Sequence, residues 1–135
     1  MSFLIDTNVF LWAAGIDGHL NQDAKDILDT PDAQIFFSSA SAWEIAIKWS
    51  KGRLTLPERP EKMIDNLISA NGFSRLSISF RDALAVADLP HFADHKDPFD
   101  RLIVAQARVN GLRLMTSDSI LEKYDVDLVL CSRTR

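Results

Sequence analysis

Short apolar segments alternate with amphipathic segments along this chain of 135 residues, and this alternation restricts the fold more than any other feature. The apolar segments have the length of strands, and the segments between them have helical spacing. We expect strands at residues 3–5, 34–37, 75–78, 112–115 and 127–130. Strands that alternate with helices typically form a parallel sheet with both faces covered. The sequence therefore predicts an α/β fold with a central parallel sheet of about five strands.

Helix boundaries follow from capping residues. We expect helices at residues 21–28, 41–51, 60–71, 79–89 and 98–110. Asp97 has the character of an N-cap, Pro98 suits the first helical position, and Gly111 follows the end of the same segment. Ser41 and Glu44 have the spacing of a capping box, which predicts a helix that begins at Ser41.

Length and composition favour one domain spanning residues 1–135, in a reducing compartment. Domains typically contain roughly 100–200 residues, and with one cysteine, Cys131, the chain cannot form an internal disulfide. The N-terminus lacks the basic region and long apolar run of a signal peptide, and no segment approaches the ~18 apolar residues of a membrane span. We therefore expect a cytoplasmic protein that does not enter the membrane.

The net charge is -4, whereas dedicated nucleic-acid-binding proteins are usually basic. This objection weakens if several of the acidic residues hold a metal ion, because a bound cation reverses the local field. Whether the chain can bind nucleic acid therefore depends more on where the carboxylates lie than on how many there are.

Two aspartates follow predicted strands. Asp6 comes directly after the strand at 3–5, and Asp118 follows the strand at 112–115. The carboxyl ends of parallel strands lie at one edge of the sheet, where α/β proteins build their sites. Each residue could also act only as an N-cap, but their shared position favours a common site.

Asp100 gives the sharpest signal for a functional carboxylate. Asp97 already serves as the N-cap of its helix, and Asp100 lies on the same helix face as Ile103, Val104 and Ala107. That face should point inward, and an ionised carboxylate directed at a core is costly unless it is paired or bound to a metal. We therefore expect Asp100 to be a ligand.

Glu44 has two interpretations. It could complete the capping box with Ser41, and it forms a favourable i,i+4 pair with Lys48. However, Glu44, Lys48 and Lys51 form the polar stripe of an otherwise apolar helix, and such a stripe must face water, a cleft or a partner. The residues alone slightly favour the structural interpretation.

Histidines and aromatic residues carry weaker signals. The three histidines lack zinc-like spacing. We interpret His95 as a surface residue, with substrate contact as the alternative, and Trp43 as part of the core rather than a platform for bases. The sequence contains no P-loop and no serine-nucleophile motif.

Taken together, five segments resemble the PIN-domain family and, within it, the VapC-type toxins of bacterial toxin–antitoxin pairs. These segments are Leu-Ile-Asp-Thr-Asn at 4–8, Ser-Ala-Trp-Glu-Ile-Ala-Ile-Lys at 41–48, Gly-Arg-Leu at 52–54, Asp-Pro-Phe-Asp-Arg at 97–101 with Ala-Gln-Ala at 105–107, and Thr-Ser-Asp at 116–118. The resemblance implies a PIN-like three-layer sandwich and a metal-dependent endoribonuclease. Carried over residue by residue, the family's acidic quartet falls on Asp6, Glu44, Asp100 and Asp118. The resemblance therefore favours a functional role for Glu44, which the residues alone do not.

The resemblance also implies a cofactor and partners. Mg²⁺ or Mn²⁺ would be held by the quartet, since both ions take oxygen ligands. Thr7 and Ser117 could donate hydrogen bonds to carboxylates or phosphate, and Lys48 and Arg101 are candidate phosphate contacts. The implied partners are an RNA substrate, a cognate antitoxin protein, and a second copy of the chain in a homodimer or a toxin–antitoxin hetero-oligomer.

Three other functions remain open as alternatives. An aspartate-based phosphatase would need a second acid two residues after Asp6, where the chain has Asn8. A phosphoacceptor module would need a lysine late in the sheet, where residues 112–117 offer only Arg113. A catalytically inactive PIN-like binding protein would not need the intact quartet.

Overall fold

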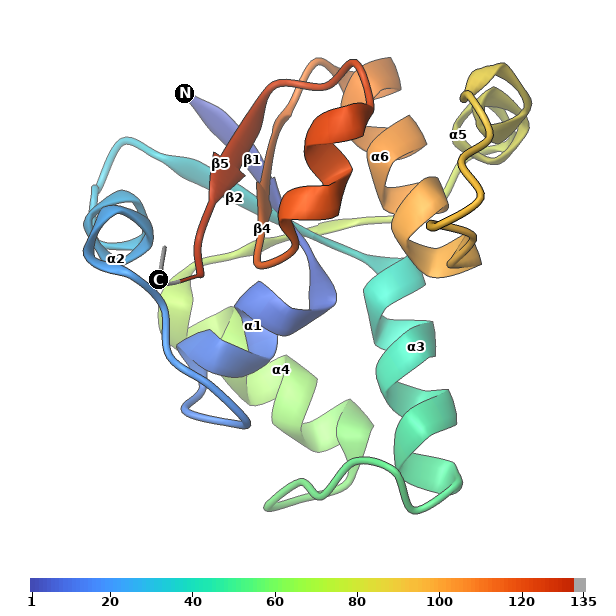
Figure 1. The fold of residues 1–135 in the computed structure, drawn as a ribbon. Coiled ribbons are helices and arrows are strands. Elements are labelled where there is room, and N and C mark those ends of the chain that lie inside the picture. The colour runs from blue at the N-terminus through green and yellow to red at the C-terminus, as the bar shows by residue number, and fades with distance from the viewer. Residues whose placement is uncertain (133–135) are drawn as a thin grey trace.

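Five parallel strands form a sheet in the order β3-β2-β1-β4-β5 in the computed structural model, which describes residues 1–132. The strands are β1 (Ser2–Ile5), β2 (Gln34–Ser38), β3 (Ser74–Leu76), β4 (Arg113–Thr116) and β5 (Leu128–Leu130). The central strand, β1, pairs with β2 on one side and β4 on the other (Figure 1). The predicted α/β fold with a five-stranded parallel sheet is confirmed.

Helices follow each of the first four strands. They are α1 (Thr7–Ala13), α2 (Gln22–Leu28), α3 (Ser39–Ser50), α4 (Pro60–Asn71), α5 (Phe80–Leu84) and α6 (Pro98–Asn110), together with the 3₁₀ helices η1 (Ala85–Asp88) and η2 (Ser119–Lys123). Within residues 1–132, none of these helices has both the length and the hydropathy needed to span a membrane.

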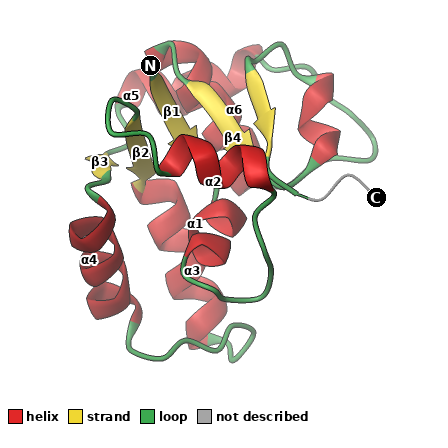
Figure 2. Cartoon of the chain, turned by 90° about the vertical axis from the view of Figure 1, so that its left-hand side faces the viewer, coloured by secondary structure: helices red, strands yellow, loops and turns green. Residues whose placement is uncertain are grey.

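Two apolar cores lie on opposite faces of the sheet, because successive side chains of a strand point to opposite faces. Phe3 and Ile5 of β1 belong to the core that includes residues of α1, α2 and α4. Leu4 belongs to the other core, with residues of α6 and η2. Helices therefore cover both faces, as Figure 2 shows, and the architecture is a three-layer sandwich.

The order of the strands reverses between β1 and β4. From β1 the chain runs outward to β2 and β3, and then returns across the sheet to β4 and β5. In open α/β sheets, ligands bind outside the carboxyl ends of the strands at such a reversal. The residues that follow Ile5 and Thr116 therefore lie where a ligand is expected to bind.

Two local predictions were wrong. Helix α3 begins at Ser39, because Ser38 at the end of β2 is its N-cap and accepts a hydrogen bond from Ala40 N at 3.0 Å. Ser41 is therefore inside the helix, and it does not form a capping box with Glu44. The segment expected as one helix at 79–89 is divided into α5 and η1.

Candidate active site

Asp6 lies at the carboxyl end of β1 and acts as the N-cap of α1. Its Oδ1 accepts a hydrogen bond from Val9 N at 2.8 Å. Its Oδ2 accepts from Thr116 Oγ1 at 2.6 Å and from Ser117 N at 3.3 Å. The capping interpretation of Asp6 is therefore correct, and its contacts also attach the carboxylate to the neighbouring strand, β4.

Burial raises the pKa of Asp6 from 3.8 to about 6. Hydrogen bonds from Thr116, Val9 and Ser117 lower this pKa, whereas the negative charge of Asp100 raises it. The net rise shows that the hydrogen bonds do not fully replace the water lost by the carboxylate. A cation would supply the missing stabilisation.

Glu44 is buried on α3, with 6% of its surface exposed. Its Oε1 accepts a hydrogen bond from Thr7 Oγ1 at 2.6 Å, and its Oε2 lies 2.6 Å from Lys48 Nζ. Thr7 therefore donates to a carboxylate of the quartet, as the sequence suggested. The ammonium group of Lys48 also lies beside the quartet.

Asp100 lies in the first turn of α6 and is partly buried. Burial raises its pKa from 3.8 to about 6, and the charges of Asp97 and Glu44 raise it as well, while a hydrogen bond from His95 lowers it. The charge of Asp100 in turn raises the pKa of Asp6. Asp100 is therefore coupled electrostatically to both Asp6 and Glu44.

Asp118 is the N-cap of η2, and its Oδ1 accepts a hydrogen bond from Ile120 N at 3.0 Å. Its own N–H donates to Thr116 Oγ1 at 3.0 Å. Asp118, Asp100 and His95 each offer a potential ligand atom, and these atoms lie within 4.8 Å of one another. Asp118 therefore lies close to Asp100, whereas Asp6 and Glu44 are related to Asp100 through the effect of their charges.

The contacts of His95 and Thr116 with the candidate carboxylates were not predicted from the sequence. His95 is 7% exposed, so its interpretation as a surface residue was wrong. Its Nε2 lies 3.2 Å from Asp100 Oδ2 and its Nδ1 lies 2.7 Å from Tyr124 Oη. The position of His95 two residues before Asp97 was a signal, but the contact with distant Tyr124 was not visible in the sequence.

Arg101 differs from its predicted role as a phosphate contact. The residue is 7% exposed, and its Nη1 donates to Pro90 O at 2.7 Å and to Tyr124 Oη at 3.2 Å. These contacts orient the guanidinium toward the protein interior and indicate a structural role. Ser117 remains beside the site, where its Oγ accepts a hydrogen bond from Asn8 Nδ2 at 3.2 Å.

Trp43 also differs from its prediction. We interpreted this residue as part of the core, but 59% of its surface is exposed. Its ring meets that of Phe99 edge-on, with 5.2 Å between centroids. Since Trp43 precedes Glu44 and Phe99 precedes Asp100, the pair lies next to the acidic site.

The donor set fits a hard divalent cation. Carboxylate oxygens are the ligands that Mg²⁺ and Mn²⁺ prefer, and two of these carboxylates carry pKa values raised to about 6. Within residues 1–132, neither Asp6 nor Asp100 forms an ion pair with a lysine or arginine. Asp6, Glu44, Asp100 and Asp118 could therefore hold the ion.

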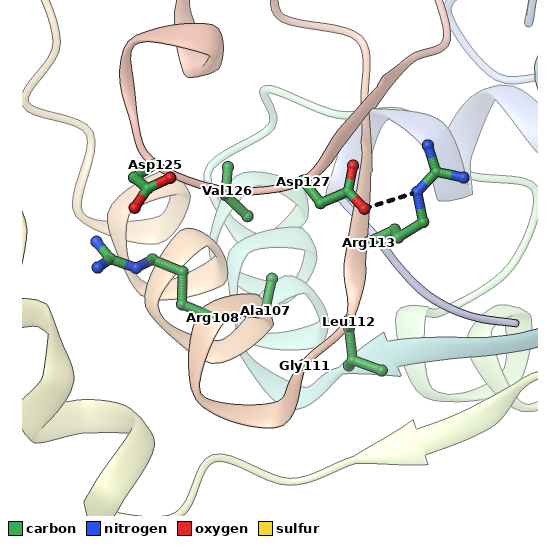
Figure 3. A pocket seen from close by; sticks show the side chains of 8 residues that line it. All are labelled: Ala107, Arg108, Gly111, Leu112, Arg113, Asp125, Val126 and Asp127. Atoms are coloured by element: carbon green, nitrogen blue, oxygen red, sulfur yellow. Dashed lines mark ion pairs between the residues drawn. The ribbon is translucent and has the colours of Figure 1, made fainter.

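A separate cavity of about 340 Å³ lies away from this site (Figure 3). It is next to Arg113, at the start of β4, and Arg108, near the end of α6. Arg113 pairs there with Asp127 at 3.1 Å, as the dashed line in Figure 3 shows. None of the four candidate carboxylates lines this cavity.

Comparisons with solved structures show the same fold. VapBC2 from Rickettsia felis, bound to a DNA fragment from its promoter, matches with a TM-score of 0.70 and 15% identity, over 98% of this chain and 100% of that chain. A toxin–antitoxin complex from Klebsiella pneumoniae gives a TM-score of 0.64 and 20% identity, over 94% and 95%. FitAcB from Neisseria gonorrhoeae gives 0.66 and 19%, over 95% and 96%.

Comparison with curated proteins gives no match. Comparison with protein families gives a match to the PIN domain over residues 3–127. This match covers most of the chain and agrees with the parallel three-layer architecture. The chain belongs to the PIN domain family.

Proposed function

We propose that this chain is a metal-dependent endoribonuclease and the toxin of a toxin–antitoxin pair, folded as a single PIN-like domain over residues 1–135. The observation that carries the proposal is the electrostatic coupling of Asp100 to Asp6 and Glu44, with Asp118 close to the same group. Gathered carboxylates repel one another and resist ionisation. A bound cation is the physical reason to keep them together.

Asp6, Glu44, Asp100 and Asp118 would hold Mg²⁺ or Mn²⁺ in this site. When bound, such an ion activates water and stabilises charge on the reacting phosphate. Thr7 donates to Glu44 and Thr116 donates to Asp6, so each hydroxyl orients one carboxylate. The Ser117 hydroxyl accepts from Asn8 and retains its proton for donation to a phosphate oxygen.

The positive charge of Lys48 would reduce the repulsion between the acidic site and the phosphates of RNA. Its ammonium group pairs with Glu44, and 47% of its side chain is exposed. A lysine binds phosphate as a point charge on a flexible stem. Lys48 could therefore contact the RNA backbone while it remains beside Glu44.

The partners follow from the related complexes. The related structure from Klebsiella pneumoniae is a toxin–antitoxin complex, and we propose that this chain likewise binds a cognate antitoxin and assembles as a homodimer or hetero-oligomer. An acidic cleft is best blocked by a cation, so an arginine or lysine of the antitoxin should reach the quartet. Co-expression of the antitoxin should relieve growth arrest caused by the chain.

Cleavage of structured RNA tests the enzymatic proposal. The purified chain should cleave RNA with Mg²⁺ or Mn²⁺, and EDTA should stop the reaction. Asp6→Asn and Asp100→Asn should abolish cleavage, whereas Asp88→Asn, which changes charge equally at an exposed position of η1, should not. An active Asp100→Asn variant would exclude Asp100 as a ligand.

The same assay separates the alternatives. An inactive PIN-like binding protein would cleave no RNA under any of these conditions. An aspartate-based phosphatase would release phosphate from small phosphoesters, and a phosphoacceptor would incorporate phosphate, without cutting an internal RNA bond. Asn8, where the phosphatase would need an acid, and the lack of a lysine in residues 112–117, where the phosphoacceptor would need one, favour the nuclease over these two alternatives.

A further inference from the structure

A buried chain of hydrogen bonds ends on Asp100. Arg101 Nη1 contacts Tyr124 Oη at 3.2 Å, Tyr124 Oη contacts His95 Nδ1 at 2.7 Å, and His95 Nε2 contacts Asp100 Oδ2 at 3.2 Å. Arg101, Tyr124 and His95 are each less than 10% exposed. The three side chains are therefore shielded from water, and Tyr124 Oη joins the other two, while Arg101 also donates to Pro90 O.

The direction of each hydrogen bond follows from the first donor. A guanidinium only donates, so Tyr124 Oη accepts from Arg101. The hydroxyl of Tyr124 then has one proton to donate, and His95 Nδ1 lies 2.7 Å away. When Nδ1 accepts a hydrogen bond from the Tyr124 hydroxyl, the proton of the neutral imidazole is on Nε2. His95 Nε2 therefore donates to Asp100 Oδ2.

The segment that carries His95 is anchored from several sides. The ring of Phe92 meets that of Tyr124 edge-on, with 5.1 Å between centroids. Asp94 pairs with Lys123, at the end of η2. The His95 and Tyr124 rings lie 5.5 Å apart at an angle of 72°. These contacts keep the imidazole in one orientation.

We propose that His95 is a positioning residue for Asp100, held in the Nε2–H tautomer by Tyr124 and Arg101, and that it is not itself a metal ligand. This inference rests on the proposed function, because it assigns the orientation of a carboxylate that would hold the cation. The hydrogen bond occupies Asp100 Oδ2. No described residue donates a hydrogen bond to Asp100 Oδ1, which remains available for the ion.

His95 lies close enough to the carboxylates that it could be either a metal ligand or a hydrogen-bond donor to Asp100. His95 Nε2 belongs with Asp100 and Asp118 to the group of potential ligand atoms. An imidazole nitrogen binds a metal only through its lone pair, and a protonated Nε2 has none to offer. Partners that orient ligands in this way typically change metal affinity or activity by about 10- to 100-fold when they are mutated.

The tautomer is measurable without RNA. Long-range ¹H–¹⁵N NMR spectra of the protein, recorded first without metal and then with Mg²⁺, should show His95 as the Nε2–H form in both states. The exposed residues His19 and His91 are internal references. Tyr124→Phe should change the His95 signals and leave those of His19 unchanged. A proton on Nδ1 of His95, or its movement there when Mg²⁺ binds, would overturn the proposal.

Two substitutions at His95 test the positioning role. Glutamine places an amide N–H close to the position of Nε2, so His95→Gln should retain Mn²⁺ affinity and cleavage close to those of the parent. His95→Leu should lose about 10- to 100-fold in Mn²⁺ affinity. His91→Gln is the matched control. Equal Mn²⁺ affinity for a folded Leu variant and the Gln variant would contradict the proposal.

Different results would contradict the nuclease activity of the chain and the positioning role of His95. A parent protein that does not cleave RNA would contradict the proposed function, while the tautomer and the Mn²⁺ affinities would still be measured on the same samples. If His95→Leu does not fold, the NMR spectra of the parent and of Tyr124→Phe decide the question alone. A parent that cleaves RNA with an Nδ1–H tautomer at His95 would overturn only the positioning role.

Discussion

Thr116 donates a hydrogen bond of 2.6 Å to Asp6 across 110 positions of the chain. The same hydroxyl oxygen accepts the N–H of Asp118 at 3.0 Å. A single fully buried side chain therefore joins the carboxyl end of β1 to the segment that carries Asp118. Thr116 therefore connects the Asp6 carboxylate to the backbone of Asp118.

Replacing Thr116 by valine should weaken cation binding and destabilise the protein. The hydroxyl lowers the pKa of Asp6, so Thr116→Val should raise that pKa further above about 6 and leave Asp118 N–H without its acceptor. Hydrogen bonds to charged groups contribute about 1.5–3 kcal/mol, which is the expected loss in unfolding free energy. Calorimetric Mn²⁺ titration and denaturant unfolding measure the two effects. Thr116→Ser should restore both, and equal behaviour of Val and Ser would contradict this role.

Glu44→Gln should keep the fold and lose most RNA cleavage. Glutamine can still accept the hydrogen bond from Thr7, but it cannot supply the negative charge that a metal ligand needs. Circular dichroism should report a native spectrum, and cleavage assays should report the loss. If Glu44→Gln cleaves RNA like the parent, the metal site depends on the aspartates alone.

Ser38→Ala provides the control for a purely structural change on the same helix. Removing this N-cap should lower stability by about 0.5–2 kcal/mol and leave cleavage near normal at low temperature. Ser41→Ala should cost less, since Ser41 does not cap α3 and no hydrogen bond to its hydroxyl is found in the described residues. A larger loss for Ser41 than for Ser38 would contradict the observed start of the helix.

The metal-free protein should lose stability as the pH rises from about 4 to above 6. Burial raises the pKa of Asp6 and of Asp100 from 3.8 to about 6, so folding favours their protonated forms. The stability that this contributes is present below the unfolded pKa and is lost as pH rises through the folded value. A pKa change of this size corresponds to roughly 3 kcal/mol for fully buried Asp6.

Thermal melting in EDTA across pH 4–8 measures this loss. Mn²⁺ should reverse it at neutral pH, and Asp100→Asn should flatten the profile because it removes one of the repelling charges. A melting temperature of the metal-free parent that rises steadily over this range would contradict the raised pKa values of Asp6 and Asp100.

Asp82 should show the opposite pH dependence, away from the site. Burial raises its pKa, but hydrogen bonds from Ser79, Gln106 and Asn110 outweigh burial and hold the pKa below 3.8. Its stabilisation is therefore present above the unfolded pKa and disappears as pH falls through the folded value.

Asp82→Asn should therefore destabilise the protein by about 1–3 kcal/mol at neutral pH, and by less near pH 3. Thermal melts of parent and variant at both pH values measure the difference. Asp88→Asn, at an exposed position, is the charge-matched control. A difference in melting temperature that grows in acid would contradict the assignment.

Local sequence signals predicted much of the fold. The strands, the N-cap at Asp97 and the C-terminal stops at Gly72 and Gly111 follow from chemistry within a few residues, and both glycines adopt the left-handed conformation that the stops require. The position of Asp6 and Asp118 after the carboxyl ends of two neighbouring parallel strands, β1 and β4, also followed from the sequence.

The contacts that the sequence did not predict depend on tertiary pairing. His95 can be buried because its Nδ1 forms a hydrogen bond with the hydroxyl of Tyr124, 29 positions away in the sequence. The guanidinium of Arg101 points into the protein because it donates to the same hydroxyl. The start of α3 at Ser39 rather than Ser41 depends on the direct passage from β2 into the helix. Trp43 is exposed because its helix lies with that side away from both cores.

The central place of β1 has a consequence for the order of synthesis. Asp6 is made well before its partners, because Thr116 ends the fourth strand along the chain and Ser117 follows it. A growing chain on the ribosome therefore carries β1 with one edge unpaired and one carboxylate unsupported until β4 has emerged. We expect nascent chains that end before β4 to lack nuclease activity, because Thr116, Ser117 and Asp118 have not yet been made.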